Sequence, residues 1–241
     1  IKFGQAKIKL FFDRGIDENI EYYKSLVEDL KKKLTGEQLK EEIKWYKKFR
    51  YIISSDNFLI VAGRNSYQNE ILIKRFLEKN DIVLKANIRD SPVVIIKSEN
   101  KEIPKSTIEE AAIMAACYSK AWLLNFDYCD VYYCKPEQII KEGWMPVGTF
   151  GIVGEKKFIR NVSLQLCIGV DLENNNIFCG PEKIVKSYFK YIFYLYPGKK
   201  SVGEIASYIE NILSEKITIN RKLLAILIPF GVGEVYYKTE E

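Results

Sequence analysis

The chain has 241 residues, of which 47% are hydrophobic and 29% charged, and it carries a formal net charge of +5 without any histidine. This length suits one large domain or two small ones, and no apolar stretch approaches the roughly 20 residues that a membrane-spanning helix needs. The absence of histidine removes the commonest general base and every Ser-His or Cys-His nucleophile pair.

Residues 1–48 are expected to form a short strand and a helical hairpin. Apolar residues alternate in Lys2–Phe12, as they do in a half-buried strand. In the next segment they recur at alternating spacings of three and four, a helical seam that Gly36 interrupts. A second helix, Glu37–Lys48, would pack antiparallel to the first as a coiled-coil stub.

The positive charge is concentrated at this hairpin. Residues 31–50 contain eight lysines and arginines against three glutamates, an excess of five that equals the net charge of the whole chain. Such a patch can attract phosphate backbones over about one Debye length, roughly 8 Å at physiological salt. A solvated helix face carries similar charge runs, so composition leaves both interpretations open.

Residues 49–170 predict a mixed β-sheet core with packed helices. Helices are expected over Gln68–Glu78 and from Thr107 to about Trp122, where Thr107 and Glu110 fit a capping box. Apolar runs separated by turn residues predict strands at Phe49–Ile53, Phe58–Ala62, Ile82–Ala86, Val93–Lys97, Asp130–Cys134, Thr149–Val153 and Leu164–Gly169.

Residues 171–241 are expected to form a smaller α/β unit after a Glu/Asn-rich turn. Helices are predicted at Pro181–Lys186 and Val202–Ile212, and extended segments at Tyr188–Leu195 and Leu223–Pro229. The unit is shorter than a usual independent domain, so it should pack on the core as an appendage. The predicted fold class is therefore α+β, preceded by the coiled-coil stub.

Five cysteines are scattered through apolar runs, and none forms a CxxC pair. This spacing does not suit a zinc site, so we expect neither a metal nor another cofactor. Reduced thiols in a core are typical of intracellular proteins, and we predict a cytoplasmic location. The chain begins at Ile1 and shows no secretory signal, so we expect a piece of a longer protein.

Three blocks carry the strongest functional signal: WYKKFRYIISS at 45–55 with GRNSYQNE at 63–70, TIEEAAIMAACYSKAW at 107–122, and VGTFGIVGEKKF at 147–158. In this order they resemble the RNA-binding R domain of the NFACT family, ribosome-associated quality-control factors that include fibronectin-binding-protein-like members. The tail from Gly180 resembles the C-terminal extension of archaeal members. The resemblance therefore covers the C-terminal part of such a protein.

The chain departs from the family pattern in two places. Family members usually carry a long coiled-coil arm, whereas the predicted hairpin is short. Where the family often has H-x-D-x-x-G, this chain has Lys85, Asn87 and Asp90. Proton transfer through imidazole is impossible there, but Lys85 and Arg89 can still donate to phosphate. The departure favours binding over catalysis.

The resemblance implies an RNA-binding domain, without a catalytic centre, of a factor that acts on obstructed large ribosomal subunits and their nascent chains. The implied partners are the large subunit and tRNA, with no membrane, and any peptide-tail addition would be catalysed by the ribosome. We predict that nine residues contact the RNA or orient the surface that contacts it. They are Arg64, Asn65, Gln68, Lys74, Arg75, Lys85, Arg89, Lys156 and Lys157.

Several of these residues have structural interpretations as well. Arg64 and Asn65 precede a predicted helix, whose N-terminus offers free N–H groups to an anion. Asn65 can instead cap that helix while Gln68 holds the turn together. Lys156 and Lys157 fit a solvated hairpin tip equally well.

Two other functions stay open for the chain as a whole. One is an enzyme for nucleic acids or small molecules, centred on Lys85 with Asn87, Asp90 and Glu70. The other is a protein-interaction scaffold that docks through the helical hairpin. Trp122 and the nearby tyrosines could stack on bases, although their spacing among aliphatic residues fits a core better.

Overall fold

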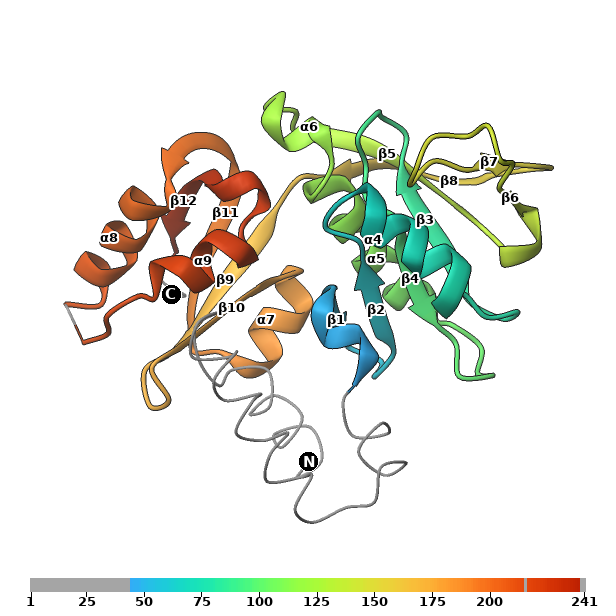
Figure 1. The fold of residues 1–241 in the computed structure, drawn as a ribbon. Coiled ribbons are helices and arrows are strands. Elements are labelled where there is room, and N and C mark those ends of the chain that lie inside the picture. Colours follow the sequence, from blue (N-terminus) through green and yellow to red (C-terminus); the bar gives the residue numbers. More distant parts are fainter. Residues whose placement is uncertain (1–43, 215, 239–241) are drawn as a thin grey trace, which may run out of the picture.

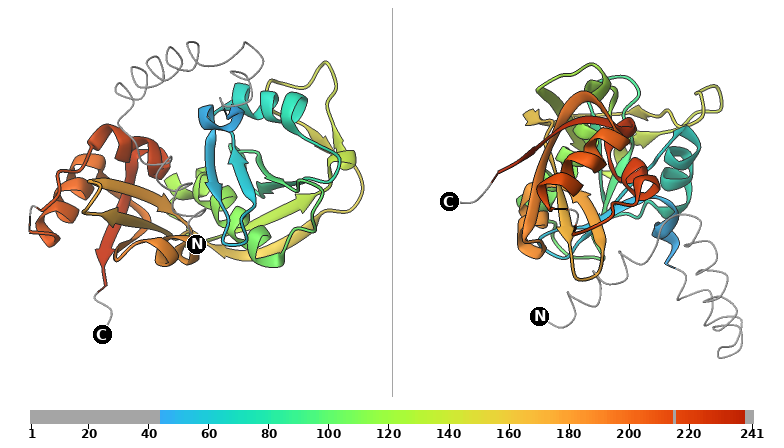
Figure 2. Two further views of the ribbon diagram at one scale, coloured as in Figure 1. Left: turned by 90° about the horizontal axis from the view of Figure 1, so that it is seen from below. Right: turned by 90° about the vertical axis from the view of Figure 1, so that its left-hand side faces the viewer.

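The computed structural model describes residues 44–214 and 216–238. Figure 1 and Figure 2 show two larger sheets side by side, each with helices packed against it. The arrangement confirms the predicted α+β fold. The predicted strand Lys2–Phe12 and nearly all of the helical hairpin lie outside the described residues, whose first element is the 3-10 turn η1 (Trp45–Lys48).

The first sheet has six strands in the order β1-β2-β4-β3-β5-β8, and each of its pairings is antiparallel. Five of the six were predicted within two residues, because apolar runs between turn residues mark strands well. The sixth, β8, was not predicted. The strands are β1 (Arg50–Ile53), β2 (Leu59–Ala62), β3 (Ile82–Ala86), β4 (Val94–Lys97), β5 (Tyr128–Cys134) and β8 (Lys157–Ser163).

Helices cover both faces of this sheet at its centre, so β2 and β4 bury all of their residues. One face packs on helix α4 (Ser66–Ile71) and the π-helical turn η2 (Leu72–Phe76) that continues it. At the border of this packed face, the ring of Trp45 stacks on that of Phe76, with the two ring centroids 4.1 Å apart. The other face packs on α5 (Lys105–Cys117), whose buried alanines allow close approach.

The second sheet is antiparallel in the order β10-β9-β11-β12. The short helix α6 (Lys120–Leu123) ties it to the rest of the chain, since Trp122 Nε1 donates to the Val232 carbonyl at 2.8 Å. The unit comprises β9 (Leu166–Asp171), β10 (Asn176–Gly180), α7 (Glu182–Tyr188), β11 (Tyr191–Ser201), α8 (Val202–Ile212), α9 (Arg221–Leu227), the 3-10 turn η4 (Pro229–Gly231) and β12 (Val232–Tyr237).

One strand prediction in this part was wrong, and another strand lies in a different sheet from the one expected. The apolar run Leu223–Pro229 predicts a strand, but α9 forms there because Asn220 accepts a hydrogen bond from the Leu223 N–H at 3.0 Å and caps the helix. The predicted strand Leu164–Gly169 forms as β9 (Leu166–Asp171), but it was expected in the core of residues 49–170, whereas β9 pairs with β10 and β11. The predicted division into units at residues 48 and 170 stays a prediction.

The predicted capping box of Thr107 and Glu110 is also wrong. The helix α5 starts earlier, with Pro104 as its N-cap, so both side chains make other contacts. Thr107 Oγ1 is hydrogen bonded to Ser54 Oγ at 3.0 Å, and Glu110 accepts from the Ser55 N–H at 2.9 Å. The two residues hold the turn between β1 and β2 against α5.

The predicted strand Thr149–Val153 is reduced to β7 (Gly151–Ile152). It pairs with β6 (Ile139–Ile140) as a two-stranded ribbon outside the first sheet, after the 3-10 turn η3 (Pro136–Gln138). Figure 1 shows this ribbon extending beyond β5 and β8. Part of the third sequence block therefore lies in a loop that folds over the sheet.

A buried ion pair closes one end of the first sheet. Lys97 Nζ donates to Asp81 Oδ2 at 2.5 Å and to the Phe76 carbonyl at 2.7 Å. The Asp81 side chain is fully buried and also accepts from the Ser98 and Glu78 N–H groups. This carboxylate organises the turn before β3, the end of β4 and the end of η2.

We expect Asp81→Asn to lower the free energy of unfolding by about 3 kcal/mol, because it removes the buried counter-charge of Lys97 and leaves the largely exposed Glu78 carboxylate, 3.1 Å away, as its ionic partner. Urea unfolding followed by circular dichroism would measure the change. Glu99→Gln is the matched control, since its pair with Lys101 is exposed and 3.9 Å long, and should cost less than about 0.5 kcal/mol. Equal losses in the two variants would contradict the importance of the buried pair.

Candidate nucleic-acid interface

The turn before α4 is held by the side chains of Asn65 and Gln68. Asn65 Oδ1 accepts from the Gln68 N–H at 2.9 Å, and Gln68 Oε1 accepts from the Arg64 N–H at 3.0 Å. Gln68 Nε2 donates to the Lys48 carbonyl at 2.9 Å. The structural interpretation of these two residues is therefore confirmed, while the side chain of Arg64 is the exposed cation of the turn.

A glycine is required at the start of this turn. A Cβ on Gly63 would lie 2.1 Å from Asn69 Oδ1. That oxygen accepts from the Val93 N–H at 3.0 Å and so anchors α4 to the residue before β4. The close approach explains why a Gly-Arg-Asn turn, and no bulkier sequence, positions Arg64.

Arg64 lines a cleft of about 610 Å³ between the start of α4 and the α9–η4 segment of the second unit. Arg50 from β1 lines the same cleft, with its guanidinium 3.9 Å from the centre of the Tyr118 ring. Burial lowers the pKa of both arginines, and the charge of Arg50 lowers the pKa of Arg64 further. Arg50 was not among the predicted contacts, although it is the charged member of an otherwise uncharged strand.

A second cationic surface, here called the basic–aromatic surface, lies where β3, β5 and β8 pair. Lys85 is opposite Tyr132, and Tyr132 is opposite Phe158, so the three side chains share one face of the sheet. Lys156 Nζ lies 4.7 Å from the Tyr132 ring centre, and the Arg160 guanidinium 4.2 Å from that of Phe158. Cations and rings therefore alternate across this face.

The surface continues through Phe150 to helix α4. The Phe150 ring centre lies 6.0 Å from Lys85 Nζ and 5.8 Å from Lys141 Nζ. Lys141 Nζ is 2.9 Å from Glu70 Oε2, and Glu70 Oε1 is 2.6 Å from Lys74 Nζ. A continuous run of contacts thus connects α4 and η2 with the edge strand β8.

Ion pairing divides the cations of this run into two groups. Hydrogen bonds from Lys74, the Gly148 N–H and Lys141 lower the pKa of Glu70 to about 2, so Glu70 neutralises charge at the helical end. Among the described residues, Lys85 and Lys156 form no ion pair. Burial lowers the pKa of Lys85, Asp90 opposes this effect, and Lys156 adds to it. On the strands Arg160 is paired with Asp130, so Lys85 and Lys156 carry the unpaired positive charge of this surface.

The predicted contacts are thus only partly brought together. Lys85 and Lys156 share the basic–aromatic surface, and Lys74 adjoins it. Arg75 on η2 and Arg89 in the loop after β3 are both exposed, outside this run of contacts. The surface also includes residues that were not predicted as contacts, namely Lys141, Phe150, Tyr132, Phe158 and Arg160.

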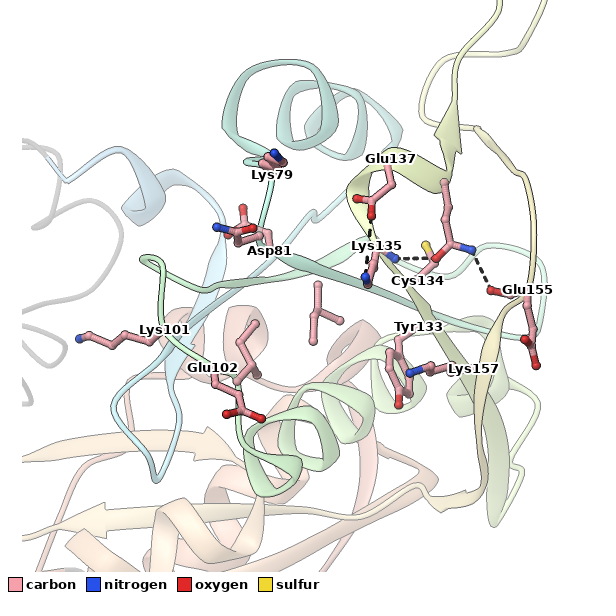
Figure 3. Close-up of a pocket in the computed structure, with 14 residues that line it drawn as sticks. Lys79, Asp81, Lys101, Glu102, Tyr133, Cys134, Lys135, Glu137, Glu155 and Lys157 are labelled. Carbon is pink, nitrogen blue, oxygen red and sulfur yellow. Dashed lines mark hydrogen bonds and ion pairs between the residues drawn. The ribbon is translucent and has the colours of Figure 1, made fainter.

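Lys157 lies elsewhere, in a separate cavity of about 460 Å³. Figure 3 shows it beside Tyr133, on the α5 side of the sheet. Four lysines and four acidic residues line this cavity; Asp81 is already paired with Lys97, and the three glutamates offset most of the lysine charge, so the cavity does not favour a polyanion. The charged residues that line it are Lys79, Lys101, Lys135, Lys157, Asp81, Glu102, Glu137 and Glu155.

The surroundings of Lys85 favour binding. Glu70 is bound by two lysines, and Asp90 lies 3.6 Å from Lys120, so the acids proposed for an enzyme centre are engaged. No group of three His, Cys, Asp or Glu residues in 44–214 and 216–238 could hold a metal ion. Within the same ranges, none of the helices has both the length and the apolar character needed to cross a membrane.

Comparison with known proteins agrees with this geometry. Residues 48–154 match the family model described as NFACT protein RNA binding domain. The chain is similar to the archaeal Rqc2 homologue aRqcH of Methanocaldococcus jannaschii, with 34% identity over 201 residues that cover 80% of this chain and 30% of that protein. It is also similar to the ribosome quality control complex subunit NEMF of Homo sapiens, with 35% identity over 131 residues, covering 52% and 12%.

Among solved structures, the C-terminal part of the fibronectin/fibrinogen-binding protein from Streptococcus suis aligns with a TM-score of 0.43 and 23% identity. The alignment covers 48% of this chain and 45% of that one. The chain spans less than one third of the length of the two curated relatives above.

We expect Glu70→Gln to destabilise the protein at neutral pH but to have less effect in acid. The pKa of Glu70 is lowered from 4.5 to about 2 on folding, so its stabilisation is complete above pH 4.5 and is lost as the pH falls toward 2. Unfolding midpoints of wild type and variant from pH 7 to pH 2 would show a converging difference. Glu109→Gln, at an exposed i,i+4 pair, is the control, and a pH-independent difference for Glu70→Gln would contradict the assignment.

Proposed function

Because residues 48–154 are an RNA-binding domain of the NFACT family, we propose that this chain holds RNA on its basic–aromatic surface as part of a ribosome quality-control factor. The aRqcH and NEMF relatives, whose names refer to Rqc2 and to ribosome quality control, support this role. The proposed partners are obstructed large ribosomal subunits with their nascent chains, and tRNA. The cytoplasm is the proposed location.

The observation that carries the proposal is the alternation of amines and rings over β3, β5 and β8. Lysines such as Lys85 and Lys156 can bind the phosphates of an RNA whatever its base sequence. Exposed rings such as Phe158, which is 39% exposed, can stack on unpaired bases, each worth about 1–3 kcal/mol. A flat face of this kind suits single-stranded or looped RNA, whose bases can be splayed out.

The exposed arginines extend the proposed interface beyond the sheet. Arg64, Arg75 and Arg89 lie on or next to α4, η2 and the loop after β3, where each can reach a phosphate of a bound RNA. Asn65 and Gln68 would act through Arg64, since their amides hold its turn. Lys157 would contact RNA only if the strand wrapped around the β8 edge.

In this role the chain positions RNA and catalyses no reaction itself. Lysine and arginine side chains donate to phosphate without transferring a proton at neutral pH. If residues are added to a stalled nascent chain, the ribosome would catalyse peptide bond formation. The chain would contribute by holding RNA in place.

We expect Lys85→Gln and Lys156→Gln each to weaken binding of tRNA by about 1 kcal/mol, roughly fivefold, through loss of one charged contact. The slope of log affinity against log salt should also fall by about one for each lost phosphate contact. Fluorescence anisotropy with labelled tRNA over a salt series would measure both quantities.

Lys105→Gln provides the matched control, because it removes the same charge from a side chain that is 91% exposed at the start of α5. It should change neither affinity nor slope by more than twofold, roughly the scatter of a surface substitution. A salt-independent affinity, or equal losses in all three variants, would rule out the basic–aromatic surface as the binding site. The same comparison with purified large ribosomal subunits would test the proposed partner.

A further inference from the structure

The cleft between α4 and the α9–η4 segment holds two guanidinium groups without an acidic partner. Neither Arg50 nor Arg64 forms an ion pair among the described residues. Arg64 NH2 donates to the Phe49 carbonyl at 3.3 Å, and the buried Arg50 Nε has no hydrogen-bond partner in the described part of the chain. The acid that lines the cleft, Asp90, lies 3.6 Å from Lys120.

The face of the Tyr118 ring, whose centre lies 3.9 Å from the guanidinium, offsets part of the charge of Arg50, but no neighbouring anion among the described residues does. Tyr118 and Cys179 are the ionisable groups whose anions would stabilise it, but burial raises the pKa of both well above neutral. The Tyr118 hydroxyl donates to the Leu227 carbonyl, which fixes the ring on which Arg50 lies. A partly desolvated guanidinium stays protonated, and an unpaired buried charge is costly. A ligand with negative charge would remove this cost.

The remaining walls of the cleft suit a planar ring. Pro92 on one side and Ile226 and Ile228 on the other are apolar, and Phe230 is 50% exposed at the same site. Ser66 and Asn65 add small polar groups near the arginines. The volume of about 610 Å³ lies within the range of small-ligand sites. An anion bearing an aromatic ring therefore fits the cleft better than a bare anion.

We propose that this cleft binds a single nucleotide, with its phosphate at the Arg50–Arg64 pair and its base against the apolar wall that includes Phe230. This site is separate from the basic–aromatic surface. If the nucleotide belongs to an RNA strand, the inference rests on the proposed RNA-binding function. The nucleotide can come from two sources, an unpaired residue of bound RNA or a free nucleoside monophosphate. Both present the same phosphate and base to the cleft.

The test measures binding of AMP, inorganic phosphate and a short single-stranded oligoribonucleotide by isothermal titration calorimetry. AMP should bind at least about tenfold more tightly than phosphate, since stacking of the base is worth more than 1 kcal/mol. Arg64→Gln should weaken AMP binding by about tenfold, because it removes a charge-assisted hydrogen bond.

Ala225→Trp is the second variant, designed to fill the cleft without altering either arginine. Ala225 lies on α9, lines the cleft and is exposed, so the indole can enter while the helix is retained. This variant should abolish AMP binding with an unchanged unfolding midpoint. If it also weakens the oligonucleotide, the ligand is a residue of RNA; if the oligonucleotide is unaffected, the ligand is a free nucleotide.

Lys85→Gln separates this proposal from the function of the basic–aromatic surface. It should weaken tRNA binding but leave AMP binding within twofold, the scatter expected of a remote substitution. Wild type that binds tRNA but binds AMP no better than phosphate would overturn the nucleotide site alone. So would AMP binding that survives Ala225→Trp. Absence of any RNA binding by wild type would overturn the proposed function and leave a free nucleotide as the ligand of the cleft.

Discussion

The two faces of the first sheet are covered to different extents, and this difference decides which side chains of the sheet are buried and which are exposed. On one face α5 spans the sheet, and its alanines let the helix lie close to the strands. On the other, η1, α4 and η2 pack over the strands of the β1 side, and Ile139, Phe150 and Ile152 reach over the sheet beyond them. Apolar side chains fill the covered area because burial is favourable there. Lysines, arginine and aromatic rings occupy the remainder, where both water and a ligand can reach them.

Much of the fold could be predicted from local patterns, and the failures have physical causes. Strands such as Ile82–Ala86 and the helix Val202–Ile212 were predicted with their observed bounds, because periodicity and turn residues agree there. The run Leu223–Pro229 is apolar throughout, so periodicity cannot distinguish a buried strand from a helix; Asn220 as a cap was the missing signal. Strand β8 was not predicted because charged residues such as Arg160 take positions on the same face as Phe158. The alternation of apolar and polar residues that marks a strand is therefore hard to recognise there.

The candidate site was less predictable because charge along a sequence does not show which charges meet. The i,i+4 pair of Glu70 with Lys74 could be read from spacing, but the contact of Glu70 with Lys141 depends on a loop far along the chain. Likewise, Lys156 and Lys157 are adjacent in sequence, yet strand geometry sends consecutive side chains to opposite faces. One therefore joins the basic–aromatic surface and the other a cavity lined by both lysines and acids.

The second unit has a larger part in the site than an appendage would. Its α9–η4 segment supplies walls of the arginine cleft, and the Leu227 carbonyl accepts the hydrogen bond of Tyr118, on whose ring Arg50 lies. The indole of Trp122 also binds the backbone at Val232. Two hydrogen bonds, from Tyr118 at the end of α5 and from Trp122 on α6, thus hold α9 and the start of β12. Residues of both units line the cleft in which Arg50 and Arg64 are partly desolvated, so the proposed nucleotide site belongs to their junction.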